Sequence, residues 1–334
     1  KLLVAMRDPI MKHFLHILLA CFLSVWLVAC GAEEITSEQH FSNAKAFLAE
    51  SDSAAAIVEL KNALQKDVHN SRARSLLGRT YFERGEYQSA VKELTRAYEK
   101  GVDTVIVVPI LAKALLSLGE YKKIEELRLG TLDPEGRSEV QAAKGLSMLY
   151  RGDLVSAKEI LGVAMANQPR SPYAEVAEAR LLMAEQNYTG ARQRLKDVFD
   201  ANKDYAPAWN LLGDVESAER NPEKAEEAYS KTLQFSPRSF DARLNRAMMR
   251  IYLKKFDGAA EDLKRLQKTA GAVANVHPGV HFANGIVQLQ HKNTNAARKS
   301  FQRAAEFSDA YPLAYYYLAA IDLESGGVGQ ALAN

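Results

Sequence analysis

A pattern of small and large residues returns about every 34 residues along most of this 334-residue chain, beginning at Ser37. A unit of this length cannot bury its apolar face alone, so neighbouring copies must stack on one another. The clearest copy begins at Ser71 and carries its marker residues at fixed places: Leu77, Gly78, Tyr81, Gly85, Tyr87, Ala90, Leu94 and Ala97. The period therefore predicts an array of repeats, each contacting mainly its neighbours.

Nine copies can be aligned, and two of their places are restricted to small residues. Counted from the first residue of each copy, the eighth place is always Gly or Ala, and the twentieth is Ala in every copy except the third, which has Ile124. These are the places where two helices of a hairpin approach closely, while large residues at places seven, eleven and twenty-four fill the gaps. The copies begin at Ser37, Ser71, Val105, Ser138, Pro172, Ala206, Phe240, Pro278 and Pro312.

This pattern resembles the tetratricopeptide repeat (TPR), which implies an all-α superhelical solenoid of helix-turn-helix hairpins. Gly85, Gly119, Gly152 and Gly326 mark the turn inside a hairpin, and Pro169 and Pro237 fall where a helix must stop before the next one. Two segments break the period, residues 129–134 and residues 270–277, and we expect a loop or a local bend of the solenoid at each.

The first thirty residues have the features of a bacterial export signal. Lys12 and His13 follow Met11, a largely apolar stretch covers residues 14–28, and Leu27-Val28-Ala29-Cys30 resembles a lipobox, in which the Cys is acylated after cleavage. An uncleaved anchor in which Cys30 is merely apolar is the alternative. We expect residues 1–29 to be an N-terminal extension and signal peptide, residues 30–36 a lipidated Cys and short tether, and residues 37–334 about eight and a half repeats. Such a protein is expected in the bacterial envelope, lipid-anchored, periplasm-facing and at the outer membrane.

Composition argues against several classes of function. After Cys30 the chain carries 40 basic and 40 acidic residues, so it has no general attraction to nucleic acid. Cys21 is lost with the leader and Cys30 is acylated, which leaves no thiol for a disulfide, a metal site or a nucleophile. His277 and His281 have helical spacing, but no carboxylate accompanies them at ligand spacing. With no phosphate-binding glycine loop or nucleophile elbow either, we expect no enzyme activity, metal or cofactor.

The better functional signal is spread over the first helix of each repeat, whose ninth and twelfth places line the groove in TPR proteins. The ninth place is basic in four of the first five copies, and the twelfth is apolar in nearly every copy. A groove of this kind suits an acidic peptide, a partner helix or an anionic glycan, although the same residues also pack between repeats. We expect the four cations to be exposed and to recognise a partner. The candidate groove residues are Lys45, Arg79, Phe82, Lys113, Leu116, Leu149, Arg180 and Met183.

The ninth copy contains a first helix but only the start of a second, after Gln330. A solenoid normally ends in a polar cap. We therefore expect the chain to be the N-terminal part of a longer protein, unless the last helix caps the stack as it stands.

The segment from Ala55 to Asp67, which follows a lipobox and one short helix, is similar to the opening of the TPR-repeat lipoproteins encoded in PEP-CTERM/exosortase exopolysaccharide loci. This resemblance implies a non-catalytic scaffold for exopolysaccharide assembly or export and for sorting of PEP-CTERM proteins, with envelope proteins, and anionic polysaccharide, as candidate partners. A TPR lipoprotein for outer-membrane protein assembly or pilus secretin targeting is an alternative. Another is the non-catalytic arm of a larger glycan-active enzyme.

Overall fold

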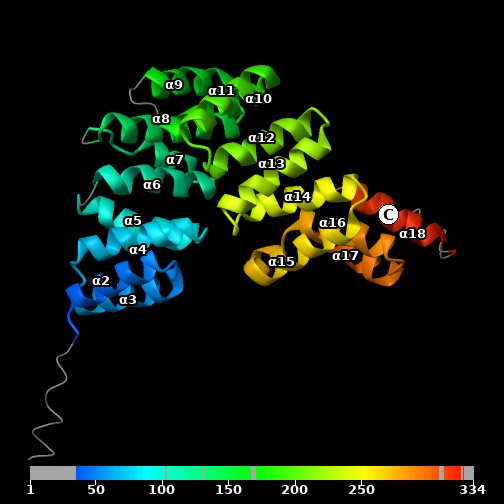
Figure 1. Ribbon diagram of the computed structural model, residues 1–334, viewed down its shortest axis with the longest axis horizontal. Coiled ribbons are helices and arrows are strands. Elements are labelled where there is room, and N and C mark those ends of the chain that lie inside the picture. Colours follow the sequence, from blue (N-terminus) through cyan, green and yellow to red (C-terminus); the bar gives the residue numbers. More distant parts are fainter. Residues whose placement is uncertain are drawn as a thin grey trace, which may run out of the picture. The chain divides into compact units, whose positions relative to one another are not determined.

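The described part of the chain is built entirely from helices. The computed structural model describes residues 35–101, 104–130, 132–166, 171–307, 312–324 and 326. These residues form seventeen helices and no strand (Figure 1). Cys30 and the leader lie outside the described residues, so the lipidation site stays a prediction. Among the described helices, none combines the length and the apolar character needed to cross a membrane.

The helices follow one another as pairs, an A helix and a B helix in each repeat. Seven A helices begin at the first residue of their repeat, and those of the third and fourth repeats begin earlier, at Thr104 and Pro134. The A helices are α2 (Ser37–Ala49), α4 (Ser71–Glu83), α6 (Thr104–Ser117), α8 (Pro134–Tyr150), α10 (Pro172–Ala184), α12 (Ala206–Ala218), α14 (Phe240–Tyr252), α16 (Pro278–Gln290) and α18 (Pro312–Glu324). The B helices are α3 (Ser53–Lys66), α5 (Tyr87–Glu99), α7 (Tyr121–Glu125), α9 (Leu154–Ala166), α11 (Tyr188–Ala201), α13 (Pro222–Phe235), α15 (Phe256–Ala274) and α17 (Thr294–Phe307).

The turn inside every hairpin uses a left-handed residue at the fifteenth place. Glycine provides it in four repeats, where Gly85, Gly119, Gly152 and Gly326 have φ between 71° and 83°. In the other five repeats a residue other than glycine adopts the same conformation, with φ between 59° and 63°. This conformation is energetically unfavourable for any residue that carries a Cβ atom. These residues are Ser51, Gln186, Arg220, Lys254 and Lys292.

Glycine at the eighth place lets a large B-helix side chain lie directly against the A helix. A Cβ on Gly213 would lie 2.5 Å from the Tyr229 ring, and one on Gly285 would lie 2.5 Å from the Phe301 ring. A third case is Gly145, where the distance to the Leu161 side chain would be 2.6 Å. The large residue is always at the twenty-fourth place, so the small-large pairing expected from the repeat is present in the hairpin core.

The two segments that break the period differ from each other. In the third repeat, helix α7 has only five residues, and α8 starts four residues before the repeat does, with Asp133 as its N-cap. In the seventh repeat, the extra residues are not a loop: α15 continues to Ala274 across a kink at Ala270, whose φ and ψ are −142° and 39°. Helix α16 then begins after His277.

The chain divides inside α4, between Thr80 and Tyr81, into two compact units. In the first unit, α2 and α3 pack through Ala44, Ala56 and Leu60, which are fully buried. The start of α4 is joined to α2 by a hydrogen bond from Asn70 Nδ2 to Ser37 Oγ of 2.9 Å.

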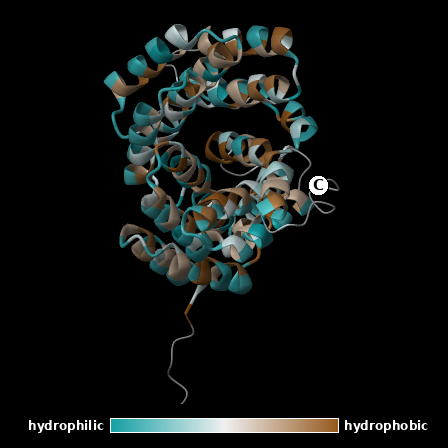
Figure 2. Cartoon of the chain, turned by 90° about the vertical axis from the view of Figure 1, so that its right-hand side faces the viewer, coloured by the Kyte–Doolittle hydropathy of each residue, from teal (hydrophilic) through white to brown (hydrophobic). Residues whose placement is uncertain are grey.

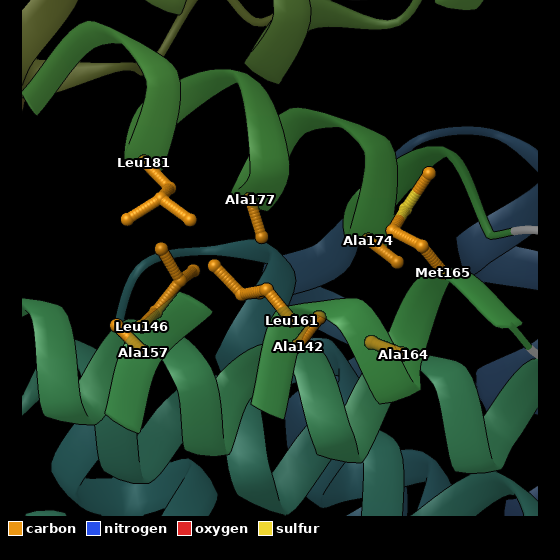
Figure 3. Packing of buried hydrophobic residues seen from close by; sticks show 9 residues of the cluster. All are labelled: Ala142, Leu146, Ala157, Leu161, Ala164, Met165, Ala174, Ala177 and Leu181. Carbon is orange, nitrogen blue, oxygen red and sulfur yellow. The ribbon is translucent and has the colours of Figure 1, made fainter. Parts of the chain in front are cut away.

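The second unit has a succession of apolar clusters, each shared by consecutive helices. One cluster lies where α8, α9 and α10 meet, with Leu181 and Ala177 of α10 facing Leu146 and Leu161 (Figure 3). Equivalent clusters join α10 to α12, α14 to α16 and α16 to α18. Hydrophobic and hydrophilic residues share most of the helices, as expected when one face of each helix packs on its neighbours (Figure 2).

A buried charge cluster joins α14 to α15. Asp262 is 1% exposed and accepts hydrogen bonds from Arg246 Nε at 2.9 Å and from Arg250 Nη1 at 2.8 Å. The Nη1 of Arg243 is 3.6 Å from the same carboxylate. Three guanidinium groups therefore compensate one buried carboxylate, an arrangement that the repeat pattern did not predict.

Candidate binding surface along the A helices

The basic ladder consists of the four cations at the ninth place, Lys45, Arg79, Lys113 and Arg180, and its two members in the first unit are exposed. Lys45 on α2 is solvent-exposed, with its ammonium 5.9 Å from the centre of the Phe41 ring. The Arg72 guanidinium lies 5.3 Å from the same ring, so two cations approach one aromatic face. Arg79 on α4 is also exposed. In this unit the predicted residues are accessible to a partner.

Lys113 is held inside the second unit by an ion pair. Its Nζ lies 2.7 Å from Glu139 Oε2, and each of the two side chains is only 19% exposed. The ammonium also lies 4.8 Å from the centre of the Tyr173 ring. Ser171 donates a hydrogen bond of 3.1 Å to the other oxygen of Glu139. The expectation that Lys113 is an exposed groove charge is therefore wrong, because the carboxylate of the next A helix neutralises it.

Arg180 is similarly positioned beside a carboxylate. Its Nη1 is 3.7 Å from Asp214 Oδ2, and the Arg180 side chain is 28% exposed. Asp214 also accepts hydrogen bonds from the Tyr229 hydroxyl at 2.9 Å and from Asn245 Nδ2 at 3.4 Å. Burial raises the pKa of Asp214, an effect opposed by Arg180 and by the Tyr229 hydrogen bond. The expectation of an exposed groove charge is thus wrong for Arg180 also, because its side chain is only partly exposed and lies beside Asp214.

Two tyrosines near the Lys113 ion pair have raised pKa values. Burial raises the pKa of Tyr173, and the nearby phenols of Tyr150 and Tyr205 and the Glu139 carboxylate raise it further. Burial and the charge of Glu139 also raise the pKa of Tyr205. Both phenols therefore stay protonated at neutral pH and can act as hydrogen-bond donors.

The four apolar candidates are half-buried and pack sideways against neighbouring helices. The Phe82 ring lies 5.7 Å from that of Tyr87. Leu116 and Leu149 border the α8–α9–α10 cluster, and Met183 borders the α10–α12 cluster. The packing of Leu116, Leu149 and Met183 at clusters shared by neighbouring repeats matches the alternative role that the sequence left open, whereas Phe82 contacts Tyr87 of its own repeat. These contacts do not test whether the four residues also bind a partner.

A hollow that the repeat pattern did not predict lies between the first turns of α6 and α8. It is open to solvent and has a volume of about 230 Å³. One wall is aliphatic and comes from α6, and the other carries three carboxylates from the start of α8. The lining residues are Val105, Ile106, Pro109, Ile110, Asp133, Glu135, Gly136 and Glu139. The sequence signal for this hollow is the apolar second and fifth places of the third repeat, Ile106 and Pro109, together with the acidic start of the next A helix.

The histidine pair of the seventh and eighth repeats is used in local contacts. The His277 ring lies 5.1 Å from that of Phe240, and His281 Nε2 lies 2.8 Å from the backbone oxygen of Asn275. Within the described ranges, no group of three His, Cys, Asp or Glu residues is placed to hold a metal ion.

Comparisons with known proteins agree on the fold. The family model of the tetratricopeptide repeat matches residues 47–105 and 148–215. No curated protein sequence matches the chain significantly. The chain is similar to the solved structure of pilF from Pseudomonas aeruginosa, with 18% identity, a TM-score of 0.52, and coverage of 59% of this chain and 88% of pilF.

Two further solved structures align over most of the chain. The human IFIT1 dimer with PPP-AAAA is 14% identical with a TM-score of 0.60, and the match covers 87% of this chain and 79% of IFIT1. The APC/C hetero-tetramer Cut9-Hcn1 is 15% identical with a TM-score of 0.58, and the match covers 89% of this chain but only 58% of that one. At these identities the likeness concerns the fold alone.

Proposed function

Because the chain has the fold of a tetratricopeptide repeat solenoid, we propose that it is a non-catalytic adaptor of the bacterial cell envelope that binds protein partners during exopolysaccharide assembly and export and PEP-CTERM protein sorting. The observations that carry the binding role are the exposed A-helix cations of the first unit and, separately, the open hollow between two A helices of the second. Folds of this kind typically act as protein-interaction scaffolds.

Attachment to the membrane through Cys30 is part of the proposal, and the start of the first helix supports it. Thr36 and Gln39 form a capping box: Thr36 Oγ1 accepts from the Gln39 amide at 3.2 Å, and Gln39 Oε1 accepts from the Thr36 amide at 2.7 Å. This fixes the N-cap of α2 six residues after Cys30. Six extended residues span at most about 20 Å. An acylated Cys30 would therefore keep the first hairpin close to the membrane surface, within reach of other envelope components.

The experiment that tests this function is a crosslinking pull-down from bacterial envelopes, with the lipidated protein as bait and Cys30→Ser as control. Recovery of polysaccharide-export or synthase components that are lost in the control supports the proposal. Recovery of outer-membrane assembly or pilus-secretin components would instead favour the other class of TPR lipoprotein. Recovery unchanged by Cys30→Ser would refute the role of the anchor.

The exposed pair Lys45 and Arg79 offers a focused test of the basic ladder. Changing both to Glu should leave folding intact, because exposed charges contribute little to stability, and should weaken capture of an acidic partner. Lys113→Glu is left out of this test, because it would place a second carboxylate beside Glu139 and could disturb the fold. Unchanged capture by the double variant would remove these two cations from the binding surface.

A further inference from the structure

The hollow between α6 and α8 has the dimensions of a side-chain pocket. Its volume of about 230 Å³ is below the roughly 300–1,000 Å³ of clefts that enclose drug-sized ligands. It can therefore receive one or two side chains of a partner.

The aliphatic wall of the hollow is formed by side chains that are exposed to solvent. Val105 is 44% exposed and Ile106 is 52% exposed, whereas Val107 and Val108 on the same helix are buried. Each Å² of apolar surface removed from water contributes about 25 cal/mol, so a partner side chain that covers these two residues gains affinity. Among the lining residues, Pro109 is buried and closes the base of this wall.

The opposite wall carries more negative charge than the protein compensates. Asp133 accepts a hydrogen bond of 2.8 Å from the Gly136 amide as N-cap of α8, and Glu139 is paired with Lys113. Glu135 is exposed and forms no ion pair with any residue that the structure describes. Three carboxylates thus face the hollow and one ammonium, that of Lys113, neutralises one of them.

Helix chemistry explains part of this charge. Acidic residues in the first turn of α8 interact favourably with the helix dipole, which accounts for Asp133 and Glu135 as stabilising residues. It does not explain why two exposed aliphatic residues of a different helix face them across a cavity. Aliphatic surface and uncompensated carboxylates in one hollow are complementary to a side-chain pair of one kind: an aliphatic residue beside a cationic one.

We propose that this hollow binds a protein segment in which an aliphatic side chain stands next to a lysine or arginine. The inference rests on the proposed function, because it specifies the chemistry of the partner. The aliphatic side chain packs on Val105 and Ile106, and the cation reaches Glu135 and shares Glu139 with Lys113. An acidic segment, which would suit the basic residues of the first unit, meets like charge here.

The direct test measures binding of labelled eight-residue peptides to the full chain by fluorescence anisotropy. The probe alternates leucine and lysine, and the two comparison peptides replace every lysine by glutamate or every leucine by serine. We expect the leucine-lysine peptide to bind at least about tenfold more tightly than either comparison, and salt to weaken it. Equal or tighter binding of the leucine-glutamate peptide would overturn the proposal.

Two variants and their matched controls assign the binding to the hollow. Glu135→Gln should weaken the leucine-lysine peptide about threefold to fivefold, and Ile106→Ser about tenfold. The controls are Glu159→Gln and Val155→Ser, exposed positions on α9, where Val155 is 81% exposed. They should bind the peptide as the unchanged protein does. If a control weakened peptide binding as much as the variant it is matched to, the assignment of binding to the hollow would be refuted.

Failure of this inference can be told apart from failure of the proposed function. The same four variants are used as bait in the envelope pull-down. If Glu135→Gln and Ile106→Ser lose the partner and the controls retain it, the hollow is its binding site. If all four retain it, the inference is wrong and the adaptor function stands. If no envelope partner is recovered with the unchanged protein, the proposed function fails, and the peptide measurement alone decides whether the hollow binds.

Discussion

The close contact between Gly285 and Phe301 makes a quantitative prediction about the hairpin core. A Cβ at position 285 would lie 2.5 Å, 2.7 Å and 2.7 Å from three atoms of the Phe301 ring. The optimal separation of carbon atoms is about 3.5–4.0 Å, so the ring must move by roughly 1 Å. It has little room, because Phe301 is fully buried and stacks on Tyr317 with ring centres 4.9 Å apart.

The magnitude follows from two opposing effects of Gly285→Ala. Overpacking a well-filled core costs about 1–3 kcal/mol. Replacing a helical glycine by alanine contributes about 1 kcal/mol in the favourable direction. Gly162 in α9 isolates the second effect, because a Cβ there meets no atom within 4 Å. We expect Gly162→Ala to stabilise the protein and Gly285→Ala to be about 1–3 kcal/mol less stable than that control.

The assay is urea unfolding followed by circular dichroism, with a double-mutant cycle that adds Phe301→Leu. The repeat already contains Ala with Leu at the same two places, in Ala247 and Leu263, so the smaller side chain should accept the added methyl group. The cycle should give a favourable coupling of about 1–3 kcal/mol. If Gly285→Ala stabilised the protein as much as Gly162→Ala, the steric argument would be refuted.

Two other features give measurable outcomes. Lys254 is exposed with φ of 59°, so Lys254→Gly should raise the free energy of unfolding by up to about 1 kcal/mol, whereas Gly85→Ala, at φ of 77°, should lower it by about as much; the same sign for both would contradict the argument. Burial and the nearby His281 lower the pKa of His277, and the charge of Asp241 opposes this shift. The contribution of His277 to stability is therefore complete above the pKa of the unfolded state, near 6.5, and is lost as the pH falls below that value. Ring titration by NMR and unfolding at pH 7 and pH 5, compared with His277→Gln, would show a larger loss in the unchanged protein.

The fold could be predicted from the sequence because its constraints repeat. The eighth place is small in every copy and the twentieth in every copy but the third, and Gly213 against Tyr229 shows the contact that imposes a small residue opposite a large one. The fifteenth-place conformation was recognised only where glycine marks it. Gln186 and Arg220 adopt it as well, because the hairpin around them requires it and overrides the local preference.

The binding surface was less predictable because it depends on which side chains of adjacent helices reach each other. Spacing placed Lys113 on the expected face, but it could not show that Glu139, on the next A helix, pairs with it. The hollow arises where the period fails: α7 stops after five residues and α8 begins early, which brings Glu135 opposite Ile106. A pattern that averages over copies contains no information about such a local departure.

The cluster around Asp262 restricts the order in which this sequence can diverge. Loss of any one of Arg243, Arg246 and Arg250 leaves the carboxylate with two guanidinium neighbours. Loss of Asp262 first leaves Arg243 and Arg246 without their shared carboxylate, while Arg250 keeps its ion pair with Glu226 at 2.9 Å. Removing one partner of a buried ion pair costs about 3–5 kcal/mol, so evolutionary paths that replace the arginines before the aspartate cost less stability than paths that begin with the aspartate.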